Sequence, residues 1–247
     1  MNVLSYFSPT GGTKRAVSMF AEAMGGTFTN VDLTNYEVRQ QPISLTPSDL
    51  LIVGVPVYGG RLPAVDDLLD CFAGDHTPCI VCACFGNRDF DDALLELSDE
   101  MTARGFDVIA GCALVIPHVY SDRLGAFRPD EADQAEITAF AEQVRAKLSA
   151  NDHTLPHIPG NRPYKEWNKP ERAPQHDESC TSCGACAAVC PVRAIDKASF
   201  AADPTRCIQC MRCVRLCPEH ARALDMSAIK EWLESLFLRR ADNAFFL

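Results

Sequence analysis

The first 150 residues alternate between short apolar runs and segments in which apolar positions recur with helical spacing. The runs at 50–55 and 79–84 are apolar almost throughout, as in strands that are buried on both faces of a parallel sheet. Strands are predicted at 2–7, 27–31, 50–55, 79–84 and 106–116. Helices are predicted at 13–24, 62–72, 89–104 and 130–148. This alternation predicts an α/β fold with a doubly wound, five-stranded parallel sheet.

The pattern breaks after residue 150. Residues 151–175 contain five prolines and show no helical period, so we expect a linker stiffened by proline. Helical spacing returns at 227–238, which we expect to pack back onto the body, and the apolar end at 244–247 is expected to bury against a neighbouring segment or a second subunit. The predicted units are therefore 1–150, the linker 151–175, a second domain at 176–225 and a C-terminal helix and tail at 226–247.

Composition narrows the possible functions. The chain has 247 residues, 47% of them hydrophobic, and a net charge of −10, which argues against a nucleic-acid partner held by phosphate contacts. It has no apolar stretch of the length that crosses a membrane, so no membrane partner is expected. The first residues lack the basic and apolar segments of a secretion signal, and the 13 cysteines of an acidic chain then indicate reduced thiols or metal in a cytoplasmic protein.

Eight of these cysteines form a repeated motif. Cys180-x2-Cys183-x2-Cys186-x3-Cys190 is followed by proline, and the motif recurs 27 residues later as Cys207-x2-Cys210-x2-Cys213-x3-Cys217, again followed by proline. In two-cluster bacterial ferredoxins, which have this spacing, the fourth cysteine of each run binds the other cluster. The predicted ligands are Cys180, Cys183, Cys186 and Cys217 for one [4Fe–4S] cluster, and Cys207, Cys210, Cys213 and Cys190 for the other. Structural zinc is the alternative, but it usually has two CxxC pairs or mixed Cys and His ligands.

In doubly wound sheets, ligands bind at the carboxyl ends of the strands, so the loops after the first, third and fourth strands are candidate sites. The first loop, at 8–14, combines hydroxyl side chains, two glycines and a helix start, which together suit a phosphate. It has neither a Walker spacing nor GxGxxG, and an ordinary helix-capping turn is the alternative. The loops at 56–63 and 85–92 each place an aromatic residue beside glycine, which lets a flat ligand approach the backbone.

The three loops together resemble those of the flavodoxin-like family, over about residues 1–150. The stretch Ser8-x-Thr10-Gly11-x-Thr13 matches the FMN-phosphate loop of that family, and residues 58–61 and 86–88 look like its two loops around the isoalloxazine ring. The resemblance implies the strand order 2-1-3-4-5 and bound FMN. It implies a cofactor site made of Ser8, Thr10, Gly11, Gly12, Thr13, Pro56, Val57, Tyr58, Gly59, Gly60, Phe85, Gly86, Asn87 and Arg88. Lys14 and Arg15 depart from the neutral form of the loop, and either point away or add charge to the phosphate.

Residues 176–224 are similar to a small α+β ferredoxin domain with two [4Fe–4S] clusters, and the whole chain resembles the flavodoxin–ferredoxin fusion proteins of anaerobic prokaryotes, also called EFR1-family ferredoxins. The resemblance implies an electron-transfer flavoprotein or oxidoreductase that passes electrons between two [4Fe–4S] clusters and FMN, with a redox protein as donor or acceptor. Two alternatives stay open. One is an FMN-dependent reductase of a small molecule that is fed by the clusters, and the other is a ferredoxin with a flavin-free docking domain.

Several other residues have two interpretations each. Cys79 and Cys82 have CxxC spacing but lie in a predicted strand, where their side chains face opposite sides, so they are expected to be core thiols. The same is expected of Cys71, Cys84 and Cys112. His118 follows the fifth strand and is either a proton donor at the flavin or an ordinary loop histidine. Tyr164 and Trp167 either cover the flavin or fix the linker.

Overall fold

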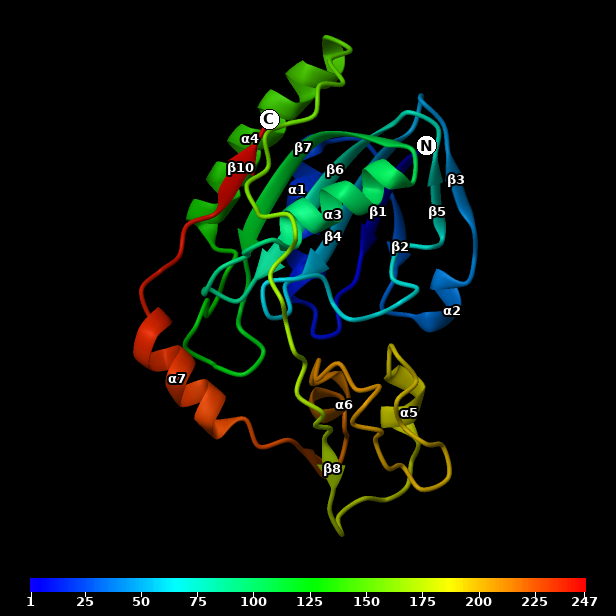
Figure 1. Ribbon diagram of the computed structural model, residues 1–247, viewed down its shortest axis with the longest axis vertical. Coiled ribbons are helices and arrows are strands. Elements are labelled where there is room, and N and C mark those ends of the chain that lie inside the picture. Colours follow the sequence, from blue (N-terminus) through cyan, green and yellow to red (C-terminus); the bar gives the residue numbers. More distant parts are fainter.

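The computed structural model describes residues 1–247 and is built on a six-stranded sheet with the order β10-β7-β6-β4-β1-β2. Five strands are parallel, and β10 pairs antiparallel with β7 at one edge. Their bounds are β1 Asn2–Tyr6, β2 Thr29–Asp32, β4 Leu50–Pro56, β6 Thr77–Phe85, β7 Phe106–Val115 and β10 Ala244–Phe246. The five parallel strands have the predicted flavodoxin-like order 2-1-3-4-5. The predicted α/β fold is confirmed (Figure 1).

Helices cover the sheet on both faces. The helices α1 (Gly12–Met24) and α4 (Glu131–Ser149) bury apolar side chains, including Phe20 and Phe140, in a core on one face. The helix α3 (Ala93–Ala103) packs into a second core on the opposite face. Because both faces are covered, every residue of β6 is buried, as its continuous apolar sequence predicts.

One predicted helix is absent from the structure. Residues 62–72 do not form a helix. They make a series of tight turns, with backbone bonds such as Leu68 to Val65, that direct apolar side chains into the core. This segment ends in β5 (Phe72–Gly74), which pairs in parallel with β3 (Ile43–Leu45); the short helix α2 (Tyr36–Arg39) precedes β3. The apolar C-terminal end buries as β10 on the edge of the sheet of its own chain.

The second domain is small and has little regular structure. Its elements are β8 (Gln175–His176), α5 (Ala185–Val189), α6 (Arg212–Arg215) and β9 (Arg222–Ala223), with β8 and β9 paired antiparallel. Figure 1 shows this domain beyond the carboxyl ends of the parallel strands. That is the edge where doubly wound sheets bind ligands.

Two segments connect the second domain to the sheet. The linker at 151–175 is irregular, as its prolines predict, and runs past α3, where Arg162 and Tyr164 both bond to Asp99. The helix α7 (Ser227–Phe237) leads back to the sheet (Figure 1). Together they tie the second domain to the first at both of its ends. No helix of the chain is both long enough and apolar enough to span a lipid bilayer.

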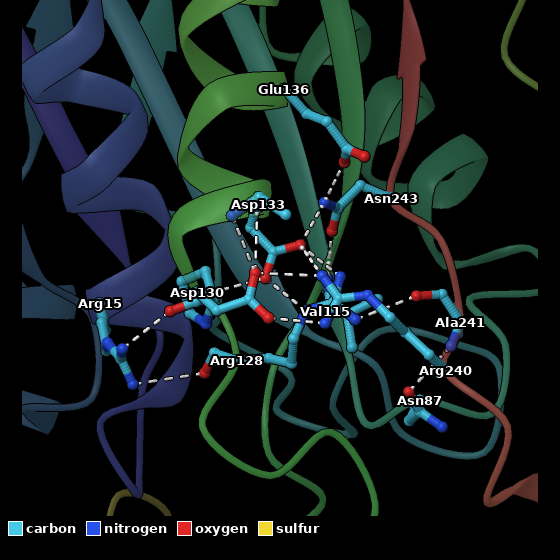
Figure 2. A network of polar contacts seen from close by, with 12 residues as sticks. Arg15, Asn87, Val115, Arg128, Asp130, Asp133, Glu136, Arg240, Ala241 and Asn243 are labelled. Carbon is cyan, nitrogen blue, oxygen red and sulfur yellow. Dashed lines mark hydrogen bonds and ion pairs between the residues drawn. The ribbon is translucent and has the colours of Figure 1, made fainter.

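A buried polar network fixes the segment after α7. Arg128 bonds to the carboxylate of Asp133 and donates to the carbonyl of Ala241 at 3.0 Å. Asn243 donates to Asp133 at 2.8 Å and accepts from the Val115 amide at 2.9 Å (Figure 2). The network joins the start of α4, the end of β7 and the residues before β10, so it holds α7 against the body.

Candidate functional site

A cavity of about 440 Å³ lies at the carboxyl ends of β1, β4, β6 and β7. This volume falls within the range of small-molecule and cofactor sites. All three predicted loops contribute to its wall. The predicted cofactor residues that line it are Ser8, Thr10, Thr13, Pro56, Val57, Tyr58, Gly59, Gly60, Gly86 and Arg88.

The first loop leads directly into the N-terminus of α1. Gly11 has a φ of 91°, a left-handed conformation that favours glycine, and α1 starts without a side-chain cap. The hydroxyl of Ser8 accepts from the Lys14 amide at 2.9 Å, and the Ser8 amide donates to Thr34 Oγ1 at 2.7 Å. These bonds fix the loop around the positive end of the helix dipole, which is an arrangement suited to an anion.

The two cations that follow this loop have partners elsewhere. Lys14 Nζ lies 5.5 Å from the centre of the Tyr6 ring. Arg15 donates to the backbone carbonyls of Arg128 and Pro129, at 3.4 and 2.8 Å. Of the two interpretations of these residues, the structure therefore favours the one in which they point away.

The second loop is a tight turn beneath an aromatic side chain. Tyr58 and Arg61 exchange backbone hydrogen bonds of 2.9 and 3.0 Å around Gly59 and Gly60, which both have positive φ. A Cβ on Gly59 would lie only 2.3 Å from the Trp167 indole, so this glycine allows Trp167 to approach and line the cavity. Trp167 is thus part of the cavity wall.

Four predicted residues lie outside the lining. Gly11 and Gly12 shape the first loop, and Phe85 is buried against Phe90 and Val115. The side chain of Asn87 donates to the carbonyls of Phe237 and Arg239 and accepts from the Ala241 amide, at 2.7, 2.9 and 3.1 Å. Asn87 therefore holds the segment after α7, and only its backbone remains to meet a ligand.

Sequence reasoning missed a group of lining residues that come from beyond the linker. All of them follow the first domain by more than 50 residues in the sequence. They are Gln209, Cys210, Met226, Ile229, Trp232 and Leu233. The helical spacing of 229, 232 and 233 indicated a buried face, but nothing in the sequence indicated which surface that face covers.

The eight motif cysteines fall into two sets, each around its own small cavity. We call Cys180, Cys183, Cys186 and Cys217 the outer set, and Cys190, Cys207, Cys210 and Cys213 the inner set. These are the two ligand sets that the motif predicts. Each of the two cavities is lined by all four cysteines of its set. No group of three or more His, Cys, Asp or Glu side chains is arranged to hold a single metal ion.

Backbone and side-chain donors point at the sulfur atoms of both sets. In the inner set, the amide of Ala194 donates to Cys190 Sγ at 3.3 Å and that of Gln209 to Cys207 Sγ at 3.4 Å. In the outer set, Arg222 Nη1 lies 3.5 Å from Cys186 Sγ. Such donors stabilise thiolates and tune the potential of an iron–sulfur cluster, so the surroundings fit that group.

Comparison with known families agrees with this chemistry. Residues 174–196 and residues 200–222 match two family models, each described as a 4Fe-4S binding domain. Together with the strand order of the sheet, these matches identify the architecture. The chain is a fusion of a flavodoxin-like α/β fold with two 4Fe-4S binding domains. No curated protein matches it.

Solved structures similar to this fusion include two flavodoxins and an oxidoreductase. Flavodoxin 2 from Bacillus cereus is 16% identical, with a TM-score of 0.43, over 59% of this chain and 98% of that one. A flavodoxin from Streptococcus pneumonia TIGR4 is 18% identical, with a TM-score of 0.40, over 59% and 98%. Rubredoxin oxygen:oxidoreductase from Desulfovibrio gigas is 18% identical, with a TM-score of 0.39, over 60% of this chain but only 36% of that one.

In the fusion, the inner set lies at the contact between the two domains. Ile208 and Cys210 are buried in the same core as α3, and Arg39 donates to the Pro191 carbonyl at 2.7 Å. Cys210 lines both the large cavity and the small cavity of the inner set. The two cavities therefore meet at this residue.

His118 and Tyr120 stand in the wall between the large cavity and the second domain. Tyr120 donates its hydroxyl to the Gln209 carbonyl at 3.0 Å and its amide to His118 Nδ1 at 3.1 Å. Burial, aided by the nearby Arg88 charge, lowers the pKa of His118 to about 4. The ring is therefore neutral at pH 7, and because Nδ1 accepts a bond, its proton lies on Nε2.

The five remaining cysteines are core thiols, as predicted. Cys79, Cys82, Cys84 and Cys112 are buried in the sheet, and burial raises the pKa of Cys71 to about 11. Cys84 also lines the large cavity. Thiols buried in apolar surroundings are poor nucleophiles.

Proposed function

We propose that this fusion is an electron-transfer flavoprotein that holds FMN in the large cavity and [4Fe–4S] clusters at the inner and outer sets. The observation that carries the proposal is the shared position of Cys210, which lines both the large cavity and the inner-set cavity. When bound, FMN exchanges one electron or two, with protons from solvent, whereas a [4Fe–4S] cluster exchanges single electrons. Placing the two sites side by side joins one-electron and two-electron chemistry in one chain.

The residues of the cavity suit both the phosphate and the ring system of FMN. Ser8 and Thr10 at the start of α1 offer hydroxyls and the helix dipole to a phosphate. Tyr58 and Trp167, whose ring centres lie 6.3 Å apart, offer apolar rings to a flat heterocycle. Holding the ring system beside Cys210 is the contribution of this chain to electron transfer.

The outer set is suited to exchange electrons with a second protein. Cys183 is exposed, and the other three outer cysteines are partly exposed. Asp177 and Glu178 precede Cys180 in the chain and Glu219 follows Cys217, and all three acidic side chains are exposed. We therefore propose a redox protein with a basic docking face as donor or acceptor, because such a face complements these charges.

The state of His118 favours an electron carrier over a small-molecule reductase. A reductase needs a group that gives a proton to its substrate, and His118, the candidate that the sequence suggests, lines the cavity. Because the pKa of His118 lies near 4, the ring is not an imidazolium at neutral pH and is a weak acid.

The proposal is tested on protein that is purified and reconstituted anaerobically with iron, sulfide and FMN. We expect about eight iron atoms and one FMN per chain, with cluster and flavin absorbance. Cys79→Ser, which alters a core thiol, is expected to keep the iron content, whereas Cys207→Ala is expected to lose about half of it. Full iron loading with no flavin would contradict the FMN site and favour a ferredoxin with a docking domain. Flavin without iron would contradict both clusters.

A further inference from the structure

Arg222 occupies the position in the second cysteine motif that Ile195 occupies in the first. The two motifs are offset by 27 residues, and each of these two residues follows the last cysteine of its motif by five residues. Both side chains are buried. Ile195 lines the cavity of the inner set, and Arg222 lines the cavity of the outer set. Two sites that the repeat makes alike therefore differ by one buried positive charge.

The guanidinium of Arg222 is held by two carbonyls and a cysteine sulfur. Its Nη1 donates to the Phe200 carbonyl at 2.8 Å and lies 3.5 Å from Cys186 Sγ, and its Nη2 donates to the Pro174 carbonyl at 2.8 Å. A buried charge is costly unless a counter-charge lies beside it. Among these partners only Cys186 can carry a negative charge, as a thiolate. The outer set therefore supplies the counter-charge of Arg222.

Arg222 also acts on one ligand of the inner set. Burial raises the pKa of the Cys213 thiol to about 11, and the charge of Arg222 and a hydrogen bond from its side chain both oppose that rise. The guanidinium thus interacts with a cysteine of each set, while the cavity that it lines is that of the outer set. Its effect is therefore expected to be largest on the outer set and to extend to the inner set.

A fixed positive charge beside an iron–sulfur cluster favours the reduced form of that cluster. Four thiolates and an oxidised [4Fe–4S] core together carry a charge of about −2, and reduction adds one more negative charge. The attraction of a nearby cation is therefore stronger after reduction than before it. Because Arg222 is buried, solvent and salt screen this attraction little.

We propose that Arg222 is the buried counter-charge of the outer cluster and raises the reduction potential of that cluster, which sets apart two sites that the repeat would otherwise make alike. This inference rests on the proposed cluster sites and not on the FMN site. The outer set is the one at the surface, with Cys183 exposed. A higher potential there makes the outer cluster easier for a partner protein to reduce.

The test measures the potentials of both clusters in the reconstituted full-length protein. A redox titration is followed by electron paramagnetic resonance, and the step that is missing in Cys183→Ala is assigned to the outer cluster. Arg222→Gln keeps a hydrogen-bond donor but removes the charge. At a fixed ambient potential, it is expected to shift the ratio of oxidised to reduced outer cluster about tenfold toward the oxidised form, which is about 59 mV for a one-electron couple. Arg222→Lys keeps the charge and is expected to retain most of the potential.

Arg206→Gln is the matched control. Arg206 directly precedes the ligand Cys207 and donates to the Val192 carbonyl at 3.0 Å, but its side chain is exposed. Because water and salt screen an exposed charge, its removal is expected to change the ratio for either cluster less than about twofold. Arg222→Met, which has an unbranched neutral side chain, is a second variant without the charge. Iron is quantified in every variant.

The outcomes separate this inference from the proposed function. An outer potential that is unchanged in Arg222→Gln, or lowered equally in Arg222→Lys, would overturn the inference and leave the clusters standing. Loss of half of the iron in both neutral variants, with full iron in Arg222→Lys, would support the counter-charge, whereas the same loss in all three would show that Arg222 acts only through its shape and would overturn it. If the unmodified protein binds no iron, the proposed cluster sites fall, and this inference falls with them.

Discussion

The two cysteine sets have the same spacing in the sequence and very different surroundings in the fold. The outer set lies at the surface, with Cys183 exposed. In the inner set, Cys210 and Cys213 are each only 8% exposed, and Cys210 is buried among residues of the sheet domain. Solvent exposure and nearby donors tune the potential of an iron–sulfur cluster, so the two sets are expected to differ in potential.

The difference shows how a symmetric motif acquires two functions. The repeat assigns ligands, but the packing of the second domain decides which set faces the sheet. Arg39, Arg212 and Tyr120 make that contact through hydrogen bonds to the carbonyls of Pro191, Pro9 and Gln209. The inner set is thereby paired with the cavity, and the outer set is left for a partner.

The largest expected difference is in electron transfer between two variants, one that lacks a ligand of the inner set and one that lacks a ligand of the outer set. Cys207→Ala and Cys183→Ala are each expected to lose one cluster and about half of the iron. Electron transfer between flavin and clusters inside the chain should be abolished in Cys207→Ala, because the inner cluster is the one beside the cavity, and should persist in Cys183→Ala. The rate is followed by flavin absorbance after a pulse of one-electron reductant. The reverse pattern would place the outer cluster beside the flavin.

The rates at which the two sets lose iron are expected to differ as well. On exposure of the protein to an oxidant and an iron chelator, we expect iron release in two phases of roughly half each, the faster from the outer set, because exposure controls access. Electron paramagnetic resonance of the reduced protein after the first phase should report the inner cluster. Release in one phase would mean that the two sets are equally accessible.

The contact that holds the inner set in place is also testable. Arg39 is 3% exposed and donates to the Leu33 and Pro191 carbonyls at 2.6 and 2.7 Å. Because Arg39→Ala leaves buried carbonyls unpaired, it should lower the free energy of unfolding in urea by about 2–4 kcal/mol. Arg206→Ala, which removes an exposed donor to the neighbouring Val192 carbonyl, is the control and should cost much less. Equal losses would show that Arg39 contributes no more than a surface residue.

The smallest expected effect is on the pH dependence of stability, and it comes from His118 in the wall between the cavity and the second domain. Burial, with the Arg88 charge, lowers the pKa of His118 from 6.5 to about 4. As the pH falls from 7 to 4, the unfolded chain takes up a proton on His118 that the folded chain does not, so stability present above pH 6.5 is lost, by up to about 3 kcal/mol. His118→Gln should flatten that part of the pH dependence in urea unfolding, whereas changing the exposed His157 to Gln should not. Parallel curves for all three proteins would contradict a neutral, buried His118.

Much of the first domain could be predicted because local patterns determine it. The apolar run at 79–84 and the helical spacing at 130–148 became β6 and α4 with ends shifted by no more than two residues. The helix predicted at 62–72 was wrong because the apolar side chains of this segment fill the core from consecutive turns. Apolar content alone does not distinguish such turns from a helix.

The parts of the site that could not be predicted depend on contacts between distant residues. The spacing of the eight cysteines was enough to indicate the two sets, since the ligands lie within one short segment. That Cys210 lines the large cavity, or that Asn87 binds the residues after α7, follows only from how the second domain and α7 return to the sheet. Pattern along the chain carries no information about such packing.

The measurement that tests the central claim most directly is the rate of flavin reduction after the clusters of fully loaded protein receive one electron. Because the inner set and the cavity share Cys210, electron transfer is expected within one chain, so the rate constant should not change with protein concentration. A rate that rises in proportion to protein concentration would show transfer between molecules and would contradict the account.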